Sequence, residues 1–277
     1  MTSFNITPAG FKQFSSFLEK SCGIVLTENK QYLVHCRLAK IMNQHAFADL
    51  ESLIQAMSRS TERELNRLVI DAMTTNETLW FRDSHPYEVL KNKFLPEYIT
   101  SSSSRVKIWS AACSTGQEPY SMAMVAAEYI EENAVCKGAK FDIVATDIST
   151  VALDLAKKGE YEAFALGRGL SDARKAKFFT QSQNNAWVVN SQIKSAVTFR
   201  AINLLDSYSM MDKVDIIFCR NVLIYFSADI KQKIIEKMHA QLKPGGYLVL
   251  GASESMPRLS NKFEMVHCRP GIVYKAI

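Results

Sequence analysis

The feature that most constrains the fold is the alternation of apolar strands with helices after residue 105. The strand segments are apolar along their whole length, which is typical of parallel strands that are covered on both faces. The last two strands have no helix between them and predict a hairpin at one edge of the sheet. We therefore expect an α/β fold with a doubly wound, mostly parallel sheet and one antiparallel edge strand. The expected strands are 105–112, 141–147, 197–205, 214–221, 247–253, 263–268 and 271–277, and the expected helices are 118–133, 151–159 and 229–242, the last one ended by the turn 243–246.

The chain before this alternation has a different pattern. Phe11, Phe14 and Leu18 recur at helical spacing, and Thr7 followed by Pro8 is suited to begin a helix. No alternation of the strand type appears there, so we expect a small domain of about four helices.

Three regions follow from these patterns. We expect an all-helical N-terminal domain at 1–73, a linker with a connecting helix at 74–104, and a domain at 105–277 whose doubly wound sheet is suited to bind a nucleotide-type cofactor. A polar stretch at about 159–197 interrupts the alternation. It is expected to form a small inserted β-subdomain, with a short strand within 187–193.

The composition excludes several classes of protein. The chain is 47% hydrophobic and 22% charged, which gives it enough apolar surface to fold. No apolar run reaches membrane-spanning length, and residues 1–14 do not resemble a signal peptide. Without an export signal we expect reduced thiols. The six cysteines and five histidines show no metal-binding spacing, so we expect no metal site. The net charge of +5 is too mild to demand a nucleic-acid partner.

Polar residues follow the expected strands where a doubly wound sheet binds its ligands. Glu118 opens the first helix, where it either interacts with the helix dipole or binds an ammonium group of a ligand. Asp147 ends the second strand and is suited to bind ribose hydroxyls, although it is equally suited to cap the next helix. Asn203 and Leu204, at the end of the third strand, are placed to frame an adenine ring.

The fourth strand carries the least ordinary residues. Arg220 and Asn221 interrupt an apolar run, which is costly unless they are paired or lie at the open end of the strand. Tyr225 follows and either lines the same opening or covers the sheet edge. Arg82, in the segment between the domains, is suited to hold a carboxylate through two hydrogen bonds, whereas Trp80 beside it is suited to anchor one domain to the other.

Taken together, these segments resemble the chemotaxis-receptor glutamate O-methyltransferases, the CheR-type family. The resemblance rests on five segments in the family's order, and it extends over essentially the whole chain. They are TTNETLWFR at 74–82, IWSAACSTGQEPYSMAM at 108–124, ATDIS at 145–149, IIFCRNVLIYF at 216–226 and KPGGYLVLGASES at 243–255. The resemblance implies a Rossmann-like class I methyltransferase that binds S-adenosylmethionine and releases S-adenosylhomocysteine. It also implies glutamate side chains on chemoreceptor cytoplasmic helices as the substrate.

The same resemblance implies roles for individual residues. The methionine end of the cofactor is expected at Asn76, Thr78, Arg82 and Glu118, with Arg82 on its carboxylate. Asp147 is expected at the ribose. The other cofactor contacts are expected from Asn203, Leu204, Arg220 and Asn221. Tyr225 is expected beside the transferred methyl group, and Arg220 or Tyr225 is expected to orient the incoming carboxylate as the catalytic pair.

Two departures from the family pattern bear on the receptor. The family often has a dense basic face on its second helix, whereas the corresponding stretch here offers Arg37 and Lys40 as the expected receptor contacts. Residues 1–85 hold nine basic and nine acidic residues, so strong electrostatic steering by this part is not expected. Some members also bind a receptor pentapeptide through a glycine-containing loop of the inserted subdomain. The stretch 179–187 has no glycine, so we expect pentapeptide-independent action.

Two rival functions remain open from the sequence. One is a regulatory module that keeps the cofactor fold without catalysis, against which Arg82, Asp147 and Arg220 argue. The other is a methyltransferase of a chemoreceptor-like protein in a surface-sensing pathway. Nucleic-acid methylation is disfavoured because no base-flipping motif follows the fourth strand. We expect a cytoplasmic monomer without membrane insertion.

Overall fold

A computed structural model describes residues 4–59, 62–101, 103–256 and 261–277. The chain divides into two compact units, which are described separately. The smaller unit comprises Met1–Thr75 and Tyr225–Lys231, and the larger one comprises Asn76–Ile224 and Gln232–Ile277.

The smaller unit is built from helices, as the sequence pattern predicts. Thr7 accepts a hydrogen bond from the Gly10 N–H at 2.9 Å and Pro8 opens the first helix, which confirms the predicted start. The side chain of Asp49 caps the third helix through the Ser52 N–H at 2.8 Å. The helices are α1 (Pro8–Cys22), η1 (Glu28–Lys30), α2 (Gln31–Gln44), α3 (Leu50–Met57) and α4 (Arg63–Met73).

The larger unit contains a seven-stranded sheet of order β6-β2-β1-β7-β8-β10-β9. Its strands are β1 (Arg105–Ala111), β2 (Lys140–Asp147), β6 (Val197–Ala201), β7 (Val214–Cys219), β8 (Leu242–Leu250), β9 (Phe263–Cys268) and β10 (Gly271–Ala276). The pairs from β6 to β8 are parallel, whereas β10 is antiparallel to both β8 and β9. This confirms the predicted mostly parallel sheet with an antiparallel hairpin at one edge.

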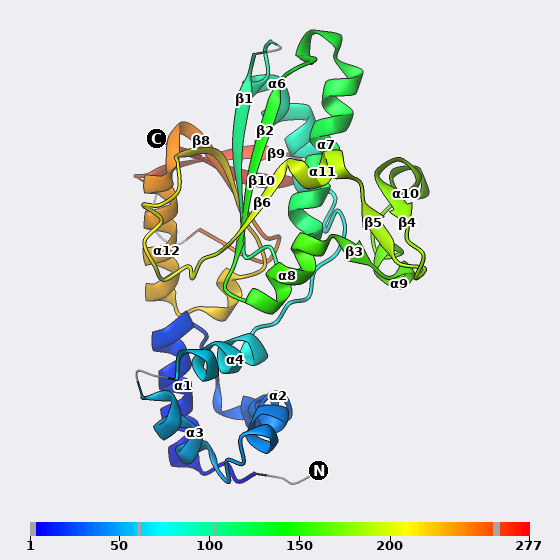
Figure 1. Cartoon of the computed structure of the whole chain (residues 1–277). Helices are drawn as coiled ribbons and strands as arrows, with labels where there is room; N and C mark the ends of the chain where they lie inside the picture. Colours follow the sequence, from blue (N-terminus) through cyan, green and yellow to red (C-terminus); the bar gives the residue numbers. More distant parts are fainter. Residues whose placement is uncertain (1–3, 60–61, 102, 257–260) are drawn as a thin grey trace. The chain divides into compact units, whose positions relative to one another are not determined.

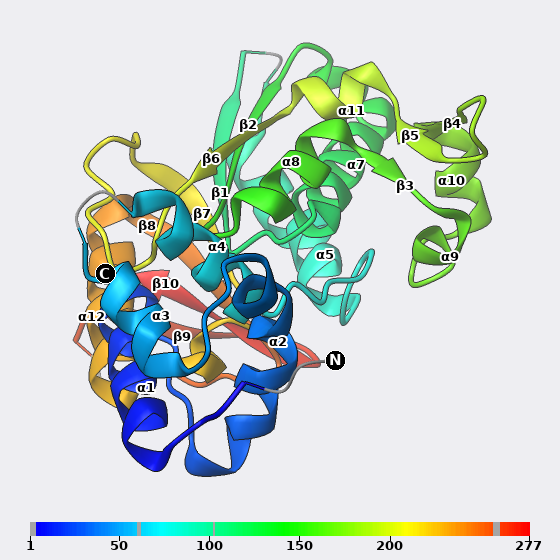
Figure 2. The same cartoon turned by 60° about the horizontal axis from the view of Figure 1, so that its bottom comes forward.

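Helices cover both faces of the sheet. The helical elements of the chain from residue 76 onward, apart from those of the insertion, are α5 (His85–Val89), η2 (Leu90–Phe94), α6 (Leu95–Tyr98), α7 (Gln117–Glu132), η3 (Ala134–Cys136), α8 (Thr150–Lys158), α11 (Ser191–Ser195), η4 (Leu223–Tyr225) and α12 (Ala228–Gln241). Figure 1 and Figure 2 show α7 and α8 on one face and α12 on the other. β7 is buried at every position, as expected for a central strand between two helical layers.

The segment 243–246 differs from its prediction as a turn that ends the last helix. β8 begins at Leu242, directly after α12, and includes all four residues. The pairing with β7 is irregular between Val214 and Ile216, and Gly245 has a φ of +74°. A Cβ on Gly246 would lie 2.8 Å from the Asp215 oxygen, so glycine lets the two strands approach at this bulge.

The insertion folds into a second, three-stranded sheet of order β3-β5-β4, so the predicted inserted β-subdomain is confirmed. Its elements are β3 (Glu160–Tyr161), α9 (Ala163–Leu166), α10 (Asp172–Phe178), β4 (Phe179–Gln181) and β5 (Trp187–Val189). All pairs in this sheet are antiparallel. In Figure 1 and Figure 2 the subdomain extends from the main sheet on the side of α7.

Candidate functional site

The carboxyl ends of the parallel strands lie along one edge of the main sheet, across the strand direction and distinct from the side formed by the β9-β10 hairpin. The Cys113 N–H, after β1, donates to the Thr146 oxygen near the end of β2 at 2.9 Å. The Ile202 N–H, after β6, donates to the backbone carbonyl oxygen of Asp147 at 3.0 Å. The segments that follow β6, β2 and β1 are therefore fastened side by side, at the edge where doubly wound folds bind nucleotides.

Asp147 fixes the loop after β1. One carboxylate oxygen accepts the Ser114 N–H at 2.7 Å, and the other accepts the Ser149 N–H at 2.9 Å. The loop is tightly turned, with φ of +52° at Ser114 and +95° at Gly116. The side chain that caps α8 is Ser149, which accepts the Ala152 N–H at 3.1 Å.

Asn203 and Leu204 directly follow β6 on the same edge. The Asn203 side-chain oxygen accepts the Leu205 N–H at 3.0 Å, which turns the chain after the strand. Leu204 is buried, and its carbonyl oxygen accepts the Tyr208 hydroxyl at 2.7 Å. The structure thus brings the two residues to the edge that also carries Asp147.

Arg220 is the centre of a buried ion network. Its side chain is only 1% exposed and donates to Glu118 at 3.0 Å and to Asp83 at 2.7 Å. It also donates to the Arg82 carbonyl oxygen at 2.9 Å. Ser110 donates to the second Glu118 oxygen at 2.8 Å, so both carboxylate oxygens are engaged. The network joins β1, α7, β7 and the segment before α5.

The charges of this network depend on one another. Burial raises the pKa of the Glu118 carboxyl above its ordinary value, although Arg220 and Ser110 oppose this effect. Burial would lower the pKa of Arg220, but the neighbouring Glu118, Tyr87 and Asp83 together outweigh this effect and the net direction is upward. The guanidinium therefore stays charged and is the counter-charge that Glu118 needs.

The segment 76–84 reaches the same edge with a strained backbone. The Asn76 carbonyl oxygen accepts the Ser114 hydroxyl at 2.8 Å, which ties the segment to the loop after β1. Phe81 and Asp83 have φ of +49° and +66°, a region that non-glycine residues rarely adopt. The half-buried Arg82 side chain donates one long hydrogen bond of 3.4 Å to the backbone carbonyl oxygen of Glu77. Thr78, which lies between these two residues in the sequence, is also half-buried.

The inserted subdomain supports this segment through Gly169. The Trp80 N–H donates to the Arg168 oxygen at 3.2 Å. Gly169 has a φ of +98°, and a Cβ there would lie 2.0 Å from the Trp80 oxygen. Trp80 is 89 positions away along the chain. Local sequence therefore gave no signal for the contact.

Gly169→Ala is expected to displace the Trp80 peptide, because the added methyl group overlaps the carbonyl oxygen and alanine disfavours a positive φ. We expect a loss of about 1–3 kcal/mol in the free energy of unfolding and weaker binding of S-adenosylhomocysteine. Chemical denaturation and calorimetric titration measure the two effects. Gly167→Ala is the matched control, since the nearest atom there is 3.6 Å away. Equal behaviour of the two variants would contradict the prediction.

Three predicted residues belong to the smaller unit. Tyr225 ends η4, and its carbonyl oxygen accepts the Val25 N–H at 3.0 Å. Arg37 on α2 donates to the Met73 oxygen at 2.6 Å and to the Thr75 hydroxyl at 2.8 Å, so it caps the end of α4. Lys40 is exposed one turn further along α2.

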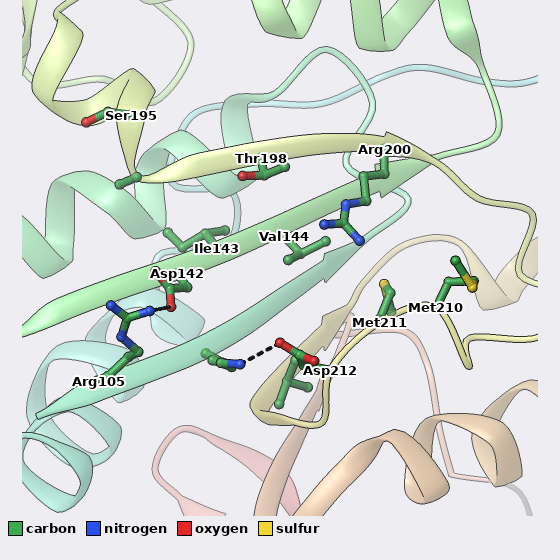
Figure 3. Close-up of a pocket in the computed structure, with 13 residues that line it drawn as sticks. Arg105, Asp142, Ile143, Val144, Ser195, Thr198, Arg200, Met210, Met211 and Asp212 are labelled. Carbon is green, nitrogen blue, oxygen red and sulfur yellow. Dashed lines mark hydrogen bonds and ion pairs between the residues drawn. The ribbon is translucent and has the colours of Figure 1, made fainter.

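A separate pocket of about 330 Å³ lies on the β1-β2-β6 part of the main sheet (Figure 3). Its walls include two ion pairs, Arg105–Asp142 at 3.0 Å and Lys107–Asp212 at 2.7 Å. The connection 202–213 from β6 to β7 contains no helix, which leaves this part of the sheet uncovered. None of the predicted cofactor residues lines the pocket.

Two kinds of feature are absent from the described ranges. No helix among them has the length and apolar character needed to cross a bilayer. Within the same ranges, no group of three or more histidine, cysteine, aspartate and glutamate side chains is placed to hold a metal ion.

Comparison with known proteins gives full-length matches. Residues 76–272 match the family model of the CheR methyltransferase SAM-binding domain, and residues 9–74 match the CheR methyltransferase all-alpha domain. The chain is 52% identical to chemotaxis protein methyltransferase 1 of Pseudomonas aeruginosa over 97% of its own length and 98% of the relative's. It is 51% identical to chemotaxis protein methyltransferase Cher2 of Pseudomonas putida, over 96% and 97% of the two lengths. Chemotaxis protein methyltransferase 1 of Vibrio cholerae is 49% identical to the chain over 99% of both lengths.

Proposed function

The chain belongs to the CheR family of S-adenosylmethionine-dependent methyltransferases, and from this premise we propose that it methylates glutamate side chains on the cytoplasmic helices of chemoreceptors. The observation that carries the proposal is the match to both family domains, which together extend over residues 9–74 and 76–272. The acidic and basic side chains at the strand ends of the larger unit support it. The product is a glutamyl methyl ester. The proposed enzyme works as a monomer in the cytoplasm.

The proposed reaction requires positioning more than acid–base chemistry. When bound, S-adenosylmethionine supplies an activated methyl group that is transferred to the carboxylate, leaving S-adenosylhomocysteine. A glutamate carboxylate is already ionised near neutral pH, so no general base is required. The chain's own residues have to align the carboxylate with the donor and exclude water. Such alignment contributes up to about 7–11 kcal/mol in favourable cases.

The residues of the strand-end edge fit the cofactor's polar groups. Asp147 is held at the end of β2 by two backbone N–H groups, and we propose that its carboxylate accepts hydrogen bonds from the ribose hydroxyls. Among the described residues, Arg82 donates one long hydrogen bond within its own segment, and we propose that its guanidinium binds the cofactor's carboxylate. We propose that Asn76 and Thr78 contact the methionine end beside Arg82, and that Asn203 and Leu204 flank the adenine.

Glu118, Arg220 and Asn221 complete the proposed site within the larger unit. Because Arg220 is 1% exposed and engaged by Glu118 and Asp83, this arrangement does not favour the predicted contact with the substrate carboxylate. We propose instead that Arg220 holds Glu118 at the cofactor's amino group. Tyr225 remains the proposed residue beside the transferred methyl group.

The proposed receptor contact lies on α2 and differs between its two predicted residues. Arg37 is engaged by the end of α4, whereas Lys40 is exposed. We therefore propose Lys40 as the main basic contact and Arg37 as a residue that shapes the surface beside it. Exposed single charges contribute modestly, in line with the neutral composition of residues 1–85.

The function is tested with tritiated S-adenosylmethionine and membranes that carry the cognate receptors. Label on a receptor that is released as methanol by mild base identifies a carboxyl methyl ester. Receptor glutamates changed to alanine should remove the label, and an Asp147→Ala enzyme serves as the negative control. Base-stable label, or no label with cofactor binding intact, would contradict the proposal.

Pentapeptide-independent action is a separate prediction about the inserted subdomain. The turn between β4 and β5 closes through the Ser182 N–H and the Ala186 oxygen at 2.7 Å, and Asn185 occupies its positive-φ position. A receptor-tail pentapeptide is expected to bind with a Kd weaker than about 100 μM, which corresponds to about 5.5 kcal/mol. Calorimetric titration measures this. Low-micromolar affinity would show that the subdomain binds the tail without a glycine in this turn.

A further inference from the structure

Glu254 lies four residues after β8 and fastens two of the strand-end loops. One carboxylate oxygen accepts the Asn221 N–H at 2.8 Å and the Gly251 N–H at 2.8 Å. The other accepts the Val222 N–H at 3.0 Å and the Leu223 N–H at 2.7 Å. A single half-buried side chain thus accepts four backbone hydrogen bonds from the segments after β7 and β8.

The three donors after β7 are consecutive because of the backbone conformation there. Asn221 has a φ of +59°, and the chain then enters the short helical turn η4. Such a left-handed residue followed by a right-handed turn aims successive N–H groups at one point and forms an anion-binding concavity, or nest. In many proteins a nest binds an external anion, but here the chain fills it with its own carboxylate.

Gly251 shows that the fit around this carboxylate is close. A Cβ on Gly251 would lie 2.6 Å from a Glu254 oxygen and 2.9 Å from the Asn221 nitrogen. The Glu254 N–H also donates to the Gly251 oxygen at 2.9 Å, which closes a turn and folds the glutamate back onto β7. The glycine is therefore required by the packing around the carboxylate and not by its own φ.

We infer that Glu254 is a positioning residue for the methyltransferase, which holds Arg220 and Asn221 in place through the nest after β7. This inference rests on the proposed cofactor contacts of these two residues. Arg220 immediately precedes the nest and Asn221 supplies its first N–H, so both side chains leave the backbone at the point that Glu254 fixes. The Glu254 charge also acts on Glu118, whose pKa is raised chiefly by burial and further by this neighbour.

The amide Glu254→Gln has the same shape and tests the charge. Whichever way the amide is oriented, its NH2 group faces two backbone N–H donors, so two of the four hydrogen bonds are lost. We expect the affinity for S-adenosylhomocysteine to fall by about 10- to 100-fold, because small misplacements of binding groups have effects of this size. Glu264→Gln, the same change on exposed edge strand β9, is the matched control and should bind like the wild type.

Chemical rescue separates positioning from a general loss of structure. Glu254→Ala opens the nest, and added acetate is expected to occupy it and restore much of the lost affinity. Chloride at equal ionic strength should not do so, and acetate should not change the wild type. Gly251→Ala, which crowds the carboxylate without removing it, should weaken binding but show no response to acetate.

The outcomes are distinct. Wild-type affinity in Glu254→Gln, or a loss in Glu254→Ala that acetate does not reverse, would overturn the inference. Titration of S-adenosylhomocysteine does not depend on the receptor, so a failure of receptor methylation leaves this test unaffected. Asn221→Ala tests the proposed cofactor contact itself, and its failure to weaken binding would count against the proposed site while the rescue result still reports on the nest.

Discussion

Asp147→Asn is expected to weaken the binding of S-adenosylhomocysteine by at least about 100-fold, which corresponds to about 2.7 kcal/mol. The wild-type carboxylate accepts the Ser114 and Ser149 N–H groups, one on each oxygen. An amide keeps one of these bonds and sets its own NH2 group against the other donor. Either the loop after β1 or the segment after β2 therefore loses its hydrogen bond to residue 147, and one proposed ribose acceptor becomes a donor.

The matched control is Asp142→Asn on the same strand. Asp142 is 40% exposed and pairs with Arg105, so its loss is expected to change cofactor affinity by less than about twofold. Calorimetric titration gives both affinities, and circular dichroism checks that both variants are folded. If the affinity of Asp147→Asn for S-adenosylhomocysteine stayed within about threefold of the wild type, the carboxylate at position 147 would stabilise the loop without binding the cofactor.

The sequence predicted the ends of β2 and β7 well because they depend on local pattern, whereas the third strand was expected to reach residue 205 and β6 ends at Ala201. Asp147 and Arg220 stand at the end of apolar runs, and a parallel sheet brings such ends to one edge whatever the loops do. The helical start at Thr7 and the hairpin at the chain's end also follow from residues close in sequence. These features need no knowledge of partners elsewhere in the chain.

The partners themselves were beyond local reasoning. A charged residue in a core strand was expected to be paired or to lie at the strand's open end, and the structure shows that Arg220 does both. Its partners Glu118 and Asp83 are 102 and 137 positions away along the chain. Sequence pattern therefore offered pairing as one of two alternatives for Arg220, but it did not indicate which residues would be the partners.

Backbone-directed roles were the hardest to predict. Glu254 acts on N–H groups, which every residue type except proline carries, so the sequence of its partners holds no mark of the contact. Gly169 depends on the approach of a distant carbonyl oxygen. Segment 243–246 was predicted as a turn because Pro and Gly are typical of turns. The same residues also occur where a strand is bulged, which is the case in β8.

Arg220→Ala is expected to lower the free energy of unfolding by about 3–5 kcal/mol, because it leaves Glu118 as a buried carboxylate without its counter-charge. Arg105→Ala is the matched control. It breaks a pair whose side chains are 53% and 40% exposed, and it should cost less than about 1 kcal/mol. Denaturant unfolding measures both losses. The double variant Arg220→Met with Glu118→Gln should regain most of the stability, since it removes both charges together.

The loss in Arg220→Ala should also depend on pH, with a sign set by Glu118. Burial raises the pKa of this carboxyl, and removing Arg220 takes away the main charge that opposes the effect. The folded variant then binds a proton more tightly than the unfolded chain, whose glutamate pKa is about 4.3. Stability therefore falls as the pH rises from about 4.3 through the raised folded pKa. The deficit relative to the wild type should be smaller at about pH 5 than at about pH 8. A deficit that is equal at both pH values, or larger at the lower one, would mean that an uncompensated Glu118 charge is not the cause of the instability.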